Sequence, residues 1–146
     1  MKNLLTLLLF SVLIFPVFGQ SNEYYDLKVV VKELRNNTGV VQFSLYNEKG
    51  SIPDEKFEKL YKSGKVKIKN NTAEFTFRVL KGGTYAVNIL HDENADGKID
   101  KGWVLPIEGI GFSNYTSIGL TNRPNFEKAS FLLNRDREIL VKVIYM

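Results

Sequence analysis

The chain of 146 residues contains no cysteine, one histidine and one tryptophan. The absence of cysteine excludes disulfide bonds, zinc sites built on thiolates and a lipid anchor on an N-terminal cysteine. The single histidine, His91, is too few for zinc or copper sites, which combine several histidine or cysteine ligands. Packing, hydrogen bonds or a metal ion bound by other ligands must therefore stabilise the fold.

The chain also lacks a large excess of charge of either sign. Lysine and arginine number 20 against 16 aspartate and glutamate residues, which gives a net charge of +4. The basic residues mostly alternate with apolar ones, as in residues 65–69, and this pattern is typical of a strand face in contact with water. Because no basic stripe carries interleaved aromatic residues, nucleic acid is not an expected partner.

A long apolar run occurs at the N-terminus, where Lys2 precedes an apolar stretch from Leu4 to Phe18. The stretch is short for a membrane span, which needs about 20 residues, and it ends near Gly19 without a basic cluster. This layout predicts a cleavable signal peptide over residues 1–19, with an uncleaved N-terminal anchor as the alternative. We expect export to the periplasm or the cell exterior, and residues 20–146 have the length of a single domain with no membrane span.

Seven segments have the alternating pattern or the composition of β-strands. They are residues 27–34, 40–46, 65–69, 72–80, 84–91, 129–133 and 138–145. Asn70-Asn71 predicts a hairpin between the third and fourth segments. Residues 51–63 carry apolar residues at helical spacing and predict one or two helical turns. The pattern indicates an all-β sandwich of about seven strands, with one short helical turn and a long ordered loop over residues 92–125.

One segment of that long loop carries oxygen-bearing side chains at alternate positions. Calcium takes six to eight hard oxygen ligands, and a glycine at the sixth position, Gly97, permits the sharp turn that points the next carbonyl inward. The predicted calcium ligands are the side chains of Asp92, Asn94, Asp96 and Asp100 and the carbonyl oxygen of Lys98.

The loop departs from the EF-hand pattern at its twelfth position, where Trp103 replaces the bidentate acid. Asp100, Glu108 or water would then have to complete the calcium shell, and the site would be weak, with a dissociation constant on the order of 10⁻⁴ to 10⁻³ M. The alternative is an Asx-rich turn whose side chains bind their own backbone.

Three aromatic residues of the same loop, Trp103, Phe112 and Tyr115, form a candidate ligand-binding platform for a glycan or a cell-surface protein. They are equally compatible with an apolar plug at the open end of the sandwich.

No catalytic residue is assigned. Ser113 has Tyr115 where a nucleophile elbow needs its second glycine, so a turn serine is the better interpretation. His91 is interpreted as a hydrogen-bonded histidine at the edge of the core, and a hydrolase that combines it with Asp92, Glu108 or Glu127 is the least favoured function. We therefore predict a non-catalytic binding or structural module.

Three ordered sequence motifs resemble a known bacterial family. They are His91–Asn94 with Gly97–Asp100, then Pro106–Asn114, then Pro124–Phe131. Together they are similar to the exported domain of unknown function DUF2141, over nearly all of the chain that follows residue 19. The resemblance implies an exported bacterial protein with an immunoglobulin-like or prealbumin-like sandwich, and it implies no activity.

Overall fold

The computed structural model describes residues 23–100, 107–119 and 121–146. The predicted signal peptide over residues 1–19 and the candidate ligand residue Trp103 lie outside these ranges. Within them, no helix has the length and apolar character needed to cross a membrane.

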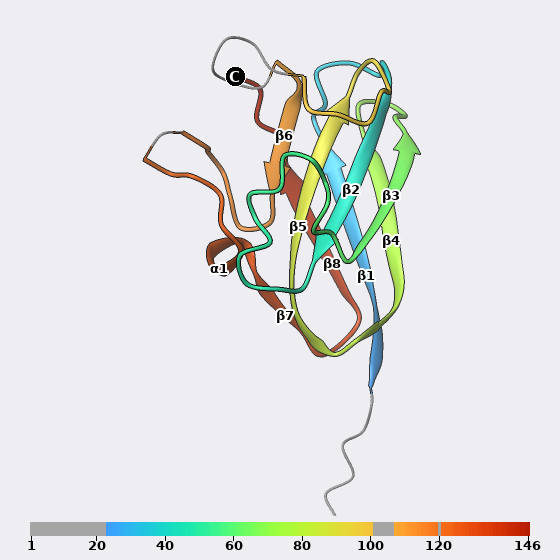
Figure 1. Ribbon diagram of the computed structural model, residues 1–146. Helices are drawn as coiled ribbons and strands as arrows, with labels where there is room; N and C mark the ends of the chain where they lie inside the picture. Colours follow the sequence, from blue (N-terminus) through green and yellow to red (C-terminus); the bar gives the residue numbers. More distant parts are fainter. Residues whose placement is uncertain (1–22, 101–106, 120) are drawn as a thin grey trace, which may run out of the picture.

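In the described residues, eight strands form two facing sheets, and one short helix lies outside the sheets (Figure 1). The elements are β1 Tyr24–Lys32, β2 Val40–Tyr46, β3 Lys62–Lys67, β4 Ala73–Lys81, β5 Gly83–Asp92, β6 Gly109–Phe112, α1 Phe126–Ala129, β7 Phe131–Leu133 and β8 Arg137–Lys142. One sheet has the order β4-β1-β8, and the other has the order β3-β2-β5-β6 with β7 paired to the beginning of β5. The predicted all-β sandwich is confirmed. The strand β6 lies within residues 92–125, where the sequence predicted a loop, so the described residues contain eight strands and not seven.

The pairing of strands is antiparallel except between β1 and β8, which run parallel from Leu27 opposite Arg137 to Lys32 opposite Lys142. A bridge between Ile110 of β6 and Ile144, just after β8, joins the two sheets on one side. Parallel strands cannot be joined by a tight turn, so this pair forms only when the two ends of the domain meet.

The main hydrophobic core lies between the two sheets. It is formed because alternate side chains of each strand point toward the opposite sheet. The inward residues of β1 and β2, such as Val29 and Phe43, have no exposed surface. The buried members of this core are Leu27, Val29, Val31, Leu34, Val41, Phe43, Leu45, Ala73, Phe77, Leu80, Tyr85, Val87, Ile89, Phe131, Leu133, Val141 and Val143.

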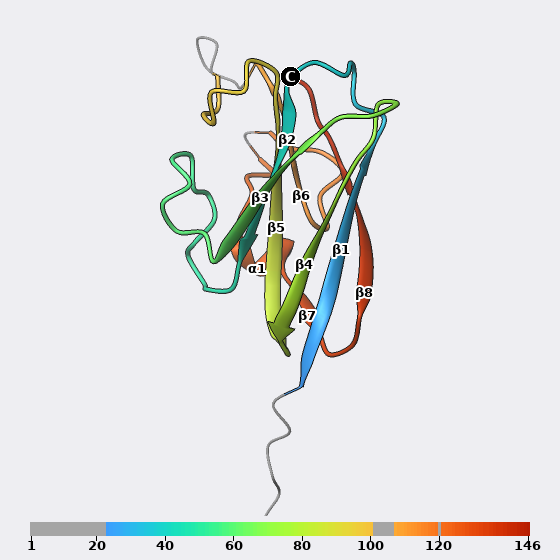
Figure 2. The same ribbon diagram turned by 90° about the vertical axis from the view of Figure 1, so that its right-hand side faces the viewer.

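A second core covers the outer face of the sheet that contains β2 and β5. Figure 2 shows α1 and the segment after β2 on the side of β5 that faces away from β1. The buried members are Tyr46, Ile52, Ala86, Leu90, Ile110, Phe112, Tyr115, Phe126 and Ala129. Strand β5 is therefore buried on both faces, which explains why eight of its residues are buried in succession.

The predicted hairpin between the third and fourth segments is wrong. Asn70 and Asn71 do form a tight turn, with φ of 51° and 53°, and Lys69 and Thr72 form a bridge across it. The strands then separate, because β3 pairs with β2 while β4 pairs with β1 in the opposite sheet. The turn was correctly located from two residues, whereas the strand partners depend on contacts far along the chain.

The helical turn predicted within residues 51–63 is also absent from that segment of the structure. Phe57 has a φ of 56°, which interrupts a right-handed helix, and the Asp54 carboxylate accepts hydrogen bonds from the backbone of Glu58 and Lys59. Phe57 and Leu60 still pack against the second core. The short helix lies instead at α1, where the Asn125 side chain accepts a hydrogen bond from the Lys128 backbone.

Candidate functional site

The candidate calcium loop begins where β5 ends. Asp92 is the last residue of β5, and its side chain has no exposed surface. In Figure 1 this end of β5 lies at the top of the molecule, together with the turn that precedes β2. The loop is therefore anchored at its first ligand position to a strand that is buried on both faces.

Hydrogen bonds inside the loop turn several of its oxygen atoms toward one another. The Asp92 carboxylate accepts from the backbone N–H of Asp96 at 3.1 Å and of Gly97 at 2.9 Å. Asn94 Oδ1 accepts from the same Asp96 N–H at 2.9 Å, so the first and third side chains meet at one donor. Asp96 Oδ1 in turn accepts from the Lys98 N–H at 2.8 Å.

Asp100 reaches back across the loop to the third position. Asn94 Nδ2 donates to Asp100 Oδ2 at 2.9 Å. The third and ninth positions are thus in contact, although five residues separate them. The four residues Asp92, Asn94, Asp96 and Asp100 are thus linked in one network, in which Asp96 meets Asp92 and Asn94 through its backbone N–H while its side chain binds the Lys98 N–H.

These contacts are those of an Asx-rich turn, and they leave capacity for a cation. Each carboxylate oxygen has two lone pairs, so one N–H bond to an oxygen does not exhaust it. Within the described residues, no group of three or more histidine, aspartate or glutamate side chains is gathered closely enough to hold a metal ion. A calcium ion would therefore also need the Asn94 amide oxygen, the Lys98 carbonyl and water.

Glu108 links the two ends of the loop by hydrogen bonds and does not occupy a calcium-ligand position. It is 3% exposed, and its two carboxylate oxygens accept from the backbone of Glu93 at 2.9 Å and of Asp100 at 3.1 Å. The sequence indicated Glu108 as a residue that could complete a calcium shell. In the structure, both oxygens are bonded to the loop backbone, and this closes the loop at its base.

The loop also packs on the turn that precedes β2. Glu93 pairs with Arg35, which donates from Nε at 2.9 Å, and Asn36 Nδ2 donates to the same carboxylate at 2.5 Å. The pKa of Glu93 is lowered to about 2, mainly because its carboxylate accepts a hydrogen bond from the Arg35 guanidinium. Gly39 permits this approach, because a Cβ there would lie 2.0 Å from the Asp92 carbonyl oxygen.

His91 occupies a buried hydrogen-bonded position beneath the loop. Its Nε2 lies 3.0 Å from the Thr38 carbonyl and its Nδ1 lies 2.7 Å from the Tyr145 hydroxyl. A carbonyl can only accept, so Nε2 carries a proton, and in the neutral imidazole Nδ1 then accepts from Tyr145. Burial raises the pKa of the Tyr145 phenol, which keeps this donor protonated. Both ring nitrogens are thus engaged, in agreement with the interpretation of His91 as a core histidine.

Lys65 is a neighbour of the loop that the sequence did not single out. Its Nζ lies 3.7 Å from Asp92 Oδ2. The alternation of residues 65–69 indicated only a solvent-facing lysine, and the strand register explains the contact. Gln42 on β2 lies opposite both Lys65 on β3 and Leu90 on β5, so Lys65 shares a sheet face with Asp92. Only the pairing of three strands could have revealed it.

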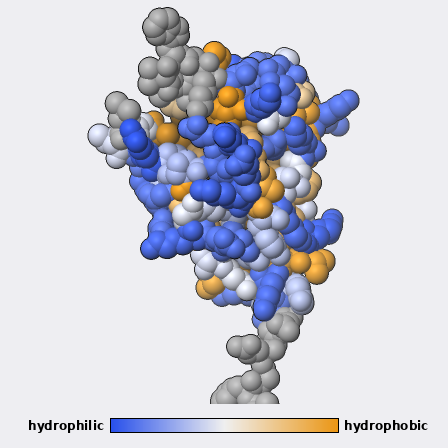
Figure 3. Space-filling model, viewed as in Figure 1, coloured by the Kyte–Doolittle hydropathy of each residue, from blue (hydrophilic) through white to orange (hydrophobic). Residues whose placement is uncertain are grey.

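Two of the three aromatic residues proposed as a ligand platform are buried. Phe112 is 8% exposed and Tyr115 is 3% exposed, and their ring centroids are 6.0 Å apart within the second core. They cover the outer face of β5 and offer no open ring face to a glycan. In the view of Figure 3, hydrophobic residues occur as small separate patches among hydrophilic ones.

Ser113 is likewise engaged in the fold. Its hydroxyl donates to the Ala129 carbonyl at 2.6 Å and accepts from the Val87 N–H at 2.9 Å. Glu127, another residue considered for a hydrolase, lies on α1 and pairs with Lys49 at 3.5 Å. Ser113 thus links β5 to the end of α1.

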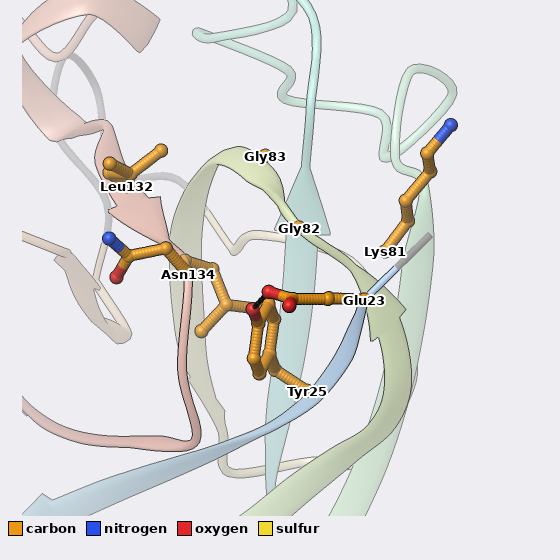
Figure 4. A pocket seen from close by; sticks show the side chains of 8 residues that line it. Glu23, Tyr25, Lys81, Gly82, Gly83, Leu132 and Asn134 are labelled. Carbon is orange, nitrogen blue, oxygen red and sulfur yellow. Dashed lines mark hydrogen bonds between the residues drawn. The ribbon is translucent and has the colours of Figure 1, made fainter. Parts of the chain in front are cut away.

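A hollow of about 270 Å³ lies at the other end of the sandwich, where β1 begins and β4 turns into β5. Figure 4 shows the Tyr25 hydroxyl directed at the Glu23 carboxylate, while the Lys81 ammonium extends away from them. The hydrogen bond to Glu23 is the main cause that raises the pKa of Tyr25. Because its polar groups do not converge on the hollow, the loop that follows β5 is the stronger candidate site.

The motifs that resemble DUF2141 thus coincide with the Asp92–Asp100 loop, with β6 and the Glu108 that precedes it, and with α1. No curated protein and no solved structure matches the chain. Residues 29–140 match the family described as uncharacterized protein conserved in bacteria, DUF2141. Because this match covers well over half of the sequence, the chain belongs to the DUF2141 family.

Proposed function

We propose that this protein is an exported, non-catalytic binding or structural module whose Asp92–Asp100 loop binds calcium. The N-terminal sequence carries the export part of the proposal. The calcium part rests on one observation, the network in which Asp92, Asn94, Asp96 and Asp100 share hydrogen bonds at the end of a buried strand.

The chemistry of this donor set suits a hard cation. Calcium prefers carboxylate, amide and carbonyl oxygens over nitrogen or sulfur, and it accepts water in the remaining positions. The four side chains and the Lys98 carbonyl would bind the ion. Three aspartates would supply negative charge. The hydrogen bonds of Glu108 to both ends of the loop would hold the loop closed around the ion.

The loop is partly preorganised, and its shell is incomplete without water. Backbone N–H groups already orient Asp92 and Asp96, so less conformational entropy is lost on binding. No side chain described here takes the place of the bidentate acid that closes an EF-hand loop. These two features together support a weak site that would fill only at the millimolar calcium levels found outside cells.

The non-catalytic part of the proposal is supported by the state of the candidate catalytic groups. His91 and Ser113 are both bonded within the fold, and they lie on opposite faces of β5, since His91 contacts Tyr145 and Ser113 contacts Ala129. A nucleophile and a base must be within hydrogen-bonding reach of each other.

The test is thermal unfolding of the purified protein in 10 mM calcium and in chelator. With a dissociation constant of 10⁻⁴ to 10⁻³ M, the ion should add about 1.4 to 2.7 kcal/mol of stability and raise Tm by several degrees. Isothermal titration of the same protein should give one calcium per chain.

Two aspartate variants make the test specific to the loop. Asp96→Ala removes a predicted ligand and should abolish the calcium-dependent shift. Asp136→Ala removes an equal charge in the turn before β8, where Asp136 accepts from the Asp26 backbone, and should keep the shift. A wild-type melting curve that is identical in calcium and chelator would reject the calcium site.

A further inference from the structure

A lysine ammonium lies directly over the candidate calcium loop. Lys65 Nζ is 3.7 Å from Asp92 Oδ2, and a Cβ placed on Gly97 would be 3.0 Å from the same nitrogen. The two measurements place the ammonium at the sixth loop position, beside the first ligand. The loop thus already holds one positive charge, supplied by the protein itself.

The two partners of this ion pair differ in their freedom to move. The Asp92 side chain has no exposed surface, whereas the Lys65 side chain is 48% exposed. The separation of 3.7 Å is that of an ion pair and exceeds a normal hydrogen bond. Asp92 Oδ2 is also held by the Gly97 N–H at 2.9 Å. The carboxylate is therefore fixed, while the flexible lysine can swing into water.

We propose that Lys65 is a displaceable counter-ion that sets the affinity of this loop for divalent cations. In the metal-free protein, its ammonium compensates the charge of the buried Asp92. A calcium ion that binds the Asp92 carboxylate would repel the ammonium beside Oδ2, and the exposed lysine would move into water. This inference rests on the proposed calcium site and adds the residue that controls its strength.

The expected size of the effect follows from the electrostatics of a partly exposed site. An ammonium within several ångströms of a doubly charged ion opposes its binding, and water and salt reduce this repulsion at the surface. The lysine can also move aside, which reduces it further. We therefore expect Lys65 to weaken calcium binding by about 3- to 10-fold.

The experiment is calorimetric calcium titration of three full-length proteins at one ionic strength. Lys65→Met removes the ammonium and retains an apolar stem of similar length. Lys32→Met is the matched control, because Lys32 is exposed on β1 of the other sheet, where its strand neighbour is Lys142. Both variants lower the net charge by one.

Three- to 10-fold tighter binding by Lys65→Met alone would support the inference. Equal affinities in all three proteins, weaker binding by Lys65→Met, or equal gains in both variants would overturn it while leaving the calcium site intact. Absence of calcium binding from all three proteins would overturn the proposed function and this inference with it.

Discussion

At the scale of single residues, two glycines of β6 allow the sandwich to close on one side. A Cβ on Gly109 would lie 2.3 Å from the Tyr145 ring, and one on Gly111 would lie 2.3 Å from the Lys142 carbonyl oxygen. Both distances are far below van der Waals contact, so only glycine permits β6 to approach the end of β8 and the segment after it. The Gly-Ile-Gly sequence in the family motif thus has a packing explanation.

Gly111→Ala should therefore destabilise the fold by about 2 to 4 kcal/mol, because its methyl group meets backbone rather than a flexible side chain. Urea unfolding followed by circular dichroism measures this loss. Gly119→Ala is the control, since no atom lies within 4 Å of its Cβ position. Equal midpoints for the two variants would contradict the close approach of β6.

Tyr46 leads to a prediction about alkaline pH. Its side chain is 1% exposed and its hydroxyl donates to Asp54 Oδ2 at 3.3 Å. Burial, followed by the Asp54 charge, raises the pKa of Tyr46 well above its ordinary value of 10.0. The unfolded chain therefore loses this proton first, so the stabilisation is complete below pH 10 and declines as the pH rises above it.

Tyr46→Phe should cost about 1 kcal/mol at pH 7, where it removes a hydrogen bond, and should make the decline in stability above pH 10 shallower. Unfolding free energies at pH 7, 10 and 11 test both effects. Tyr24→Phe, at a side chain that is 56% exposed, should leave the decline unchanged. Parallel declines for wild type and Tyr46→Phe would refute the assignment.

At the scale of elements, the loop after β5 keeps its shape through Glu108. This buried carboxylate binds one N–H at each end of the loop. The sequence indicated the four oxygen donors of this loop from their local spacing, and their role as calcium ligands stays a prediction. It could not assign the role of Glu108, nor the contacts of Lys65 and Arg35, because these residues reach the loop from other strands and turns.

Glu108→Gln should destabilise the protein by about 1 to 3 kcal/mol, because an amide NH₂ would then face a backbone N–H donor in a buried position. Thermal unfolding measures the loss, and hydrogen exchange at the Glu93 and Asp100 amides should accelerate. Glu48→Gln, at an exposed turn position, serves as the control. Unchanged exchange at both amides would show that Glu108 does not hold the loop.

At the scale of the whole molecule, the two hydrophobic cores share one sheet. Tyr46, Ala86 and Leu90 of β2 and β5 belong to the second core, while their sequence neighbours Leu45, Val87 and Ile89 belong to the first. Neither core can be lost without exposing the other face of the same strands. The domain should therefore unfold in a single transition.

Phe126→Ala tests this coupling from the second core. Phe126 is 7% exposed, and its loss should cost about 3 to 5 kcal/mol. Circular dichroism and tyrosine fluorescence should still report one common midpoint, at a lower denaturant concentration. Separate midpoints for the two signals would indicate that the β4-β1-β8 sheet and the covering layer unfold independently.

The sequence by itself indicated seven of the eight strands, the turn at Asn70-Asn71, the all-β class and the oxygen-rich loop, because alternation and turn chemistry act over a few neighbouring residues. It missed β6, which lies within the predicted loop over residues 92–125. Only the tertiary structure decided that β3 joins β2, that β8 runs parallel to β1 and that a second core covers β5. It also decided that Lys65 and Glu108 meet the loop. These outcomes depend on contacts between residues that are distant in the chain. The arrangement that buries the most apolar surface decides them, and no local sequence pattern encodes it.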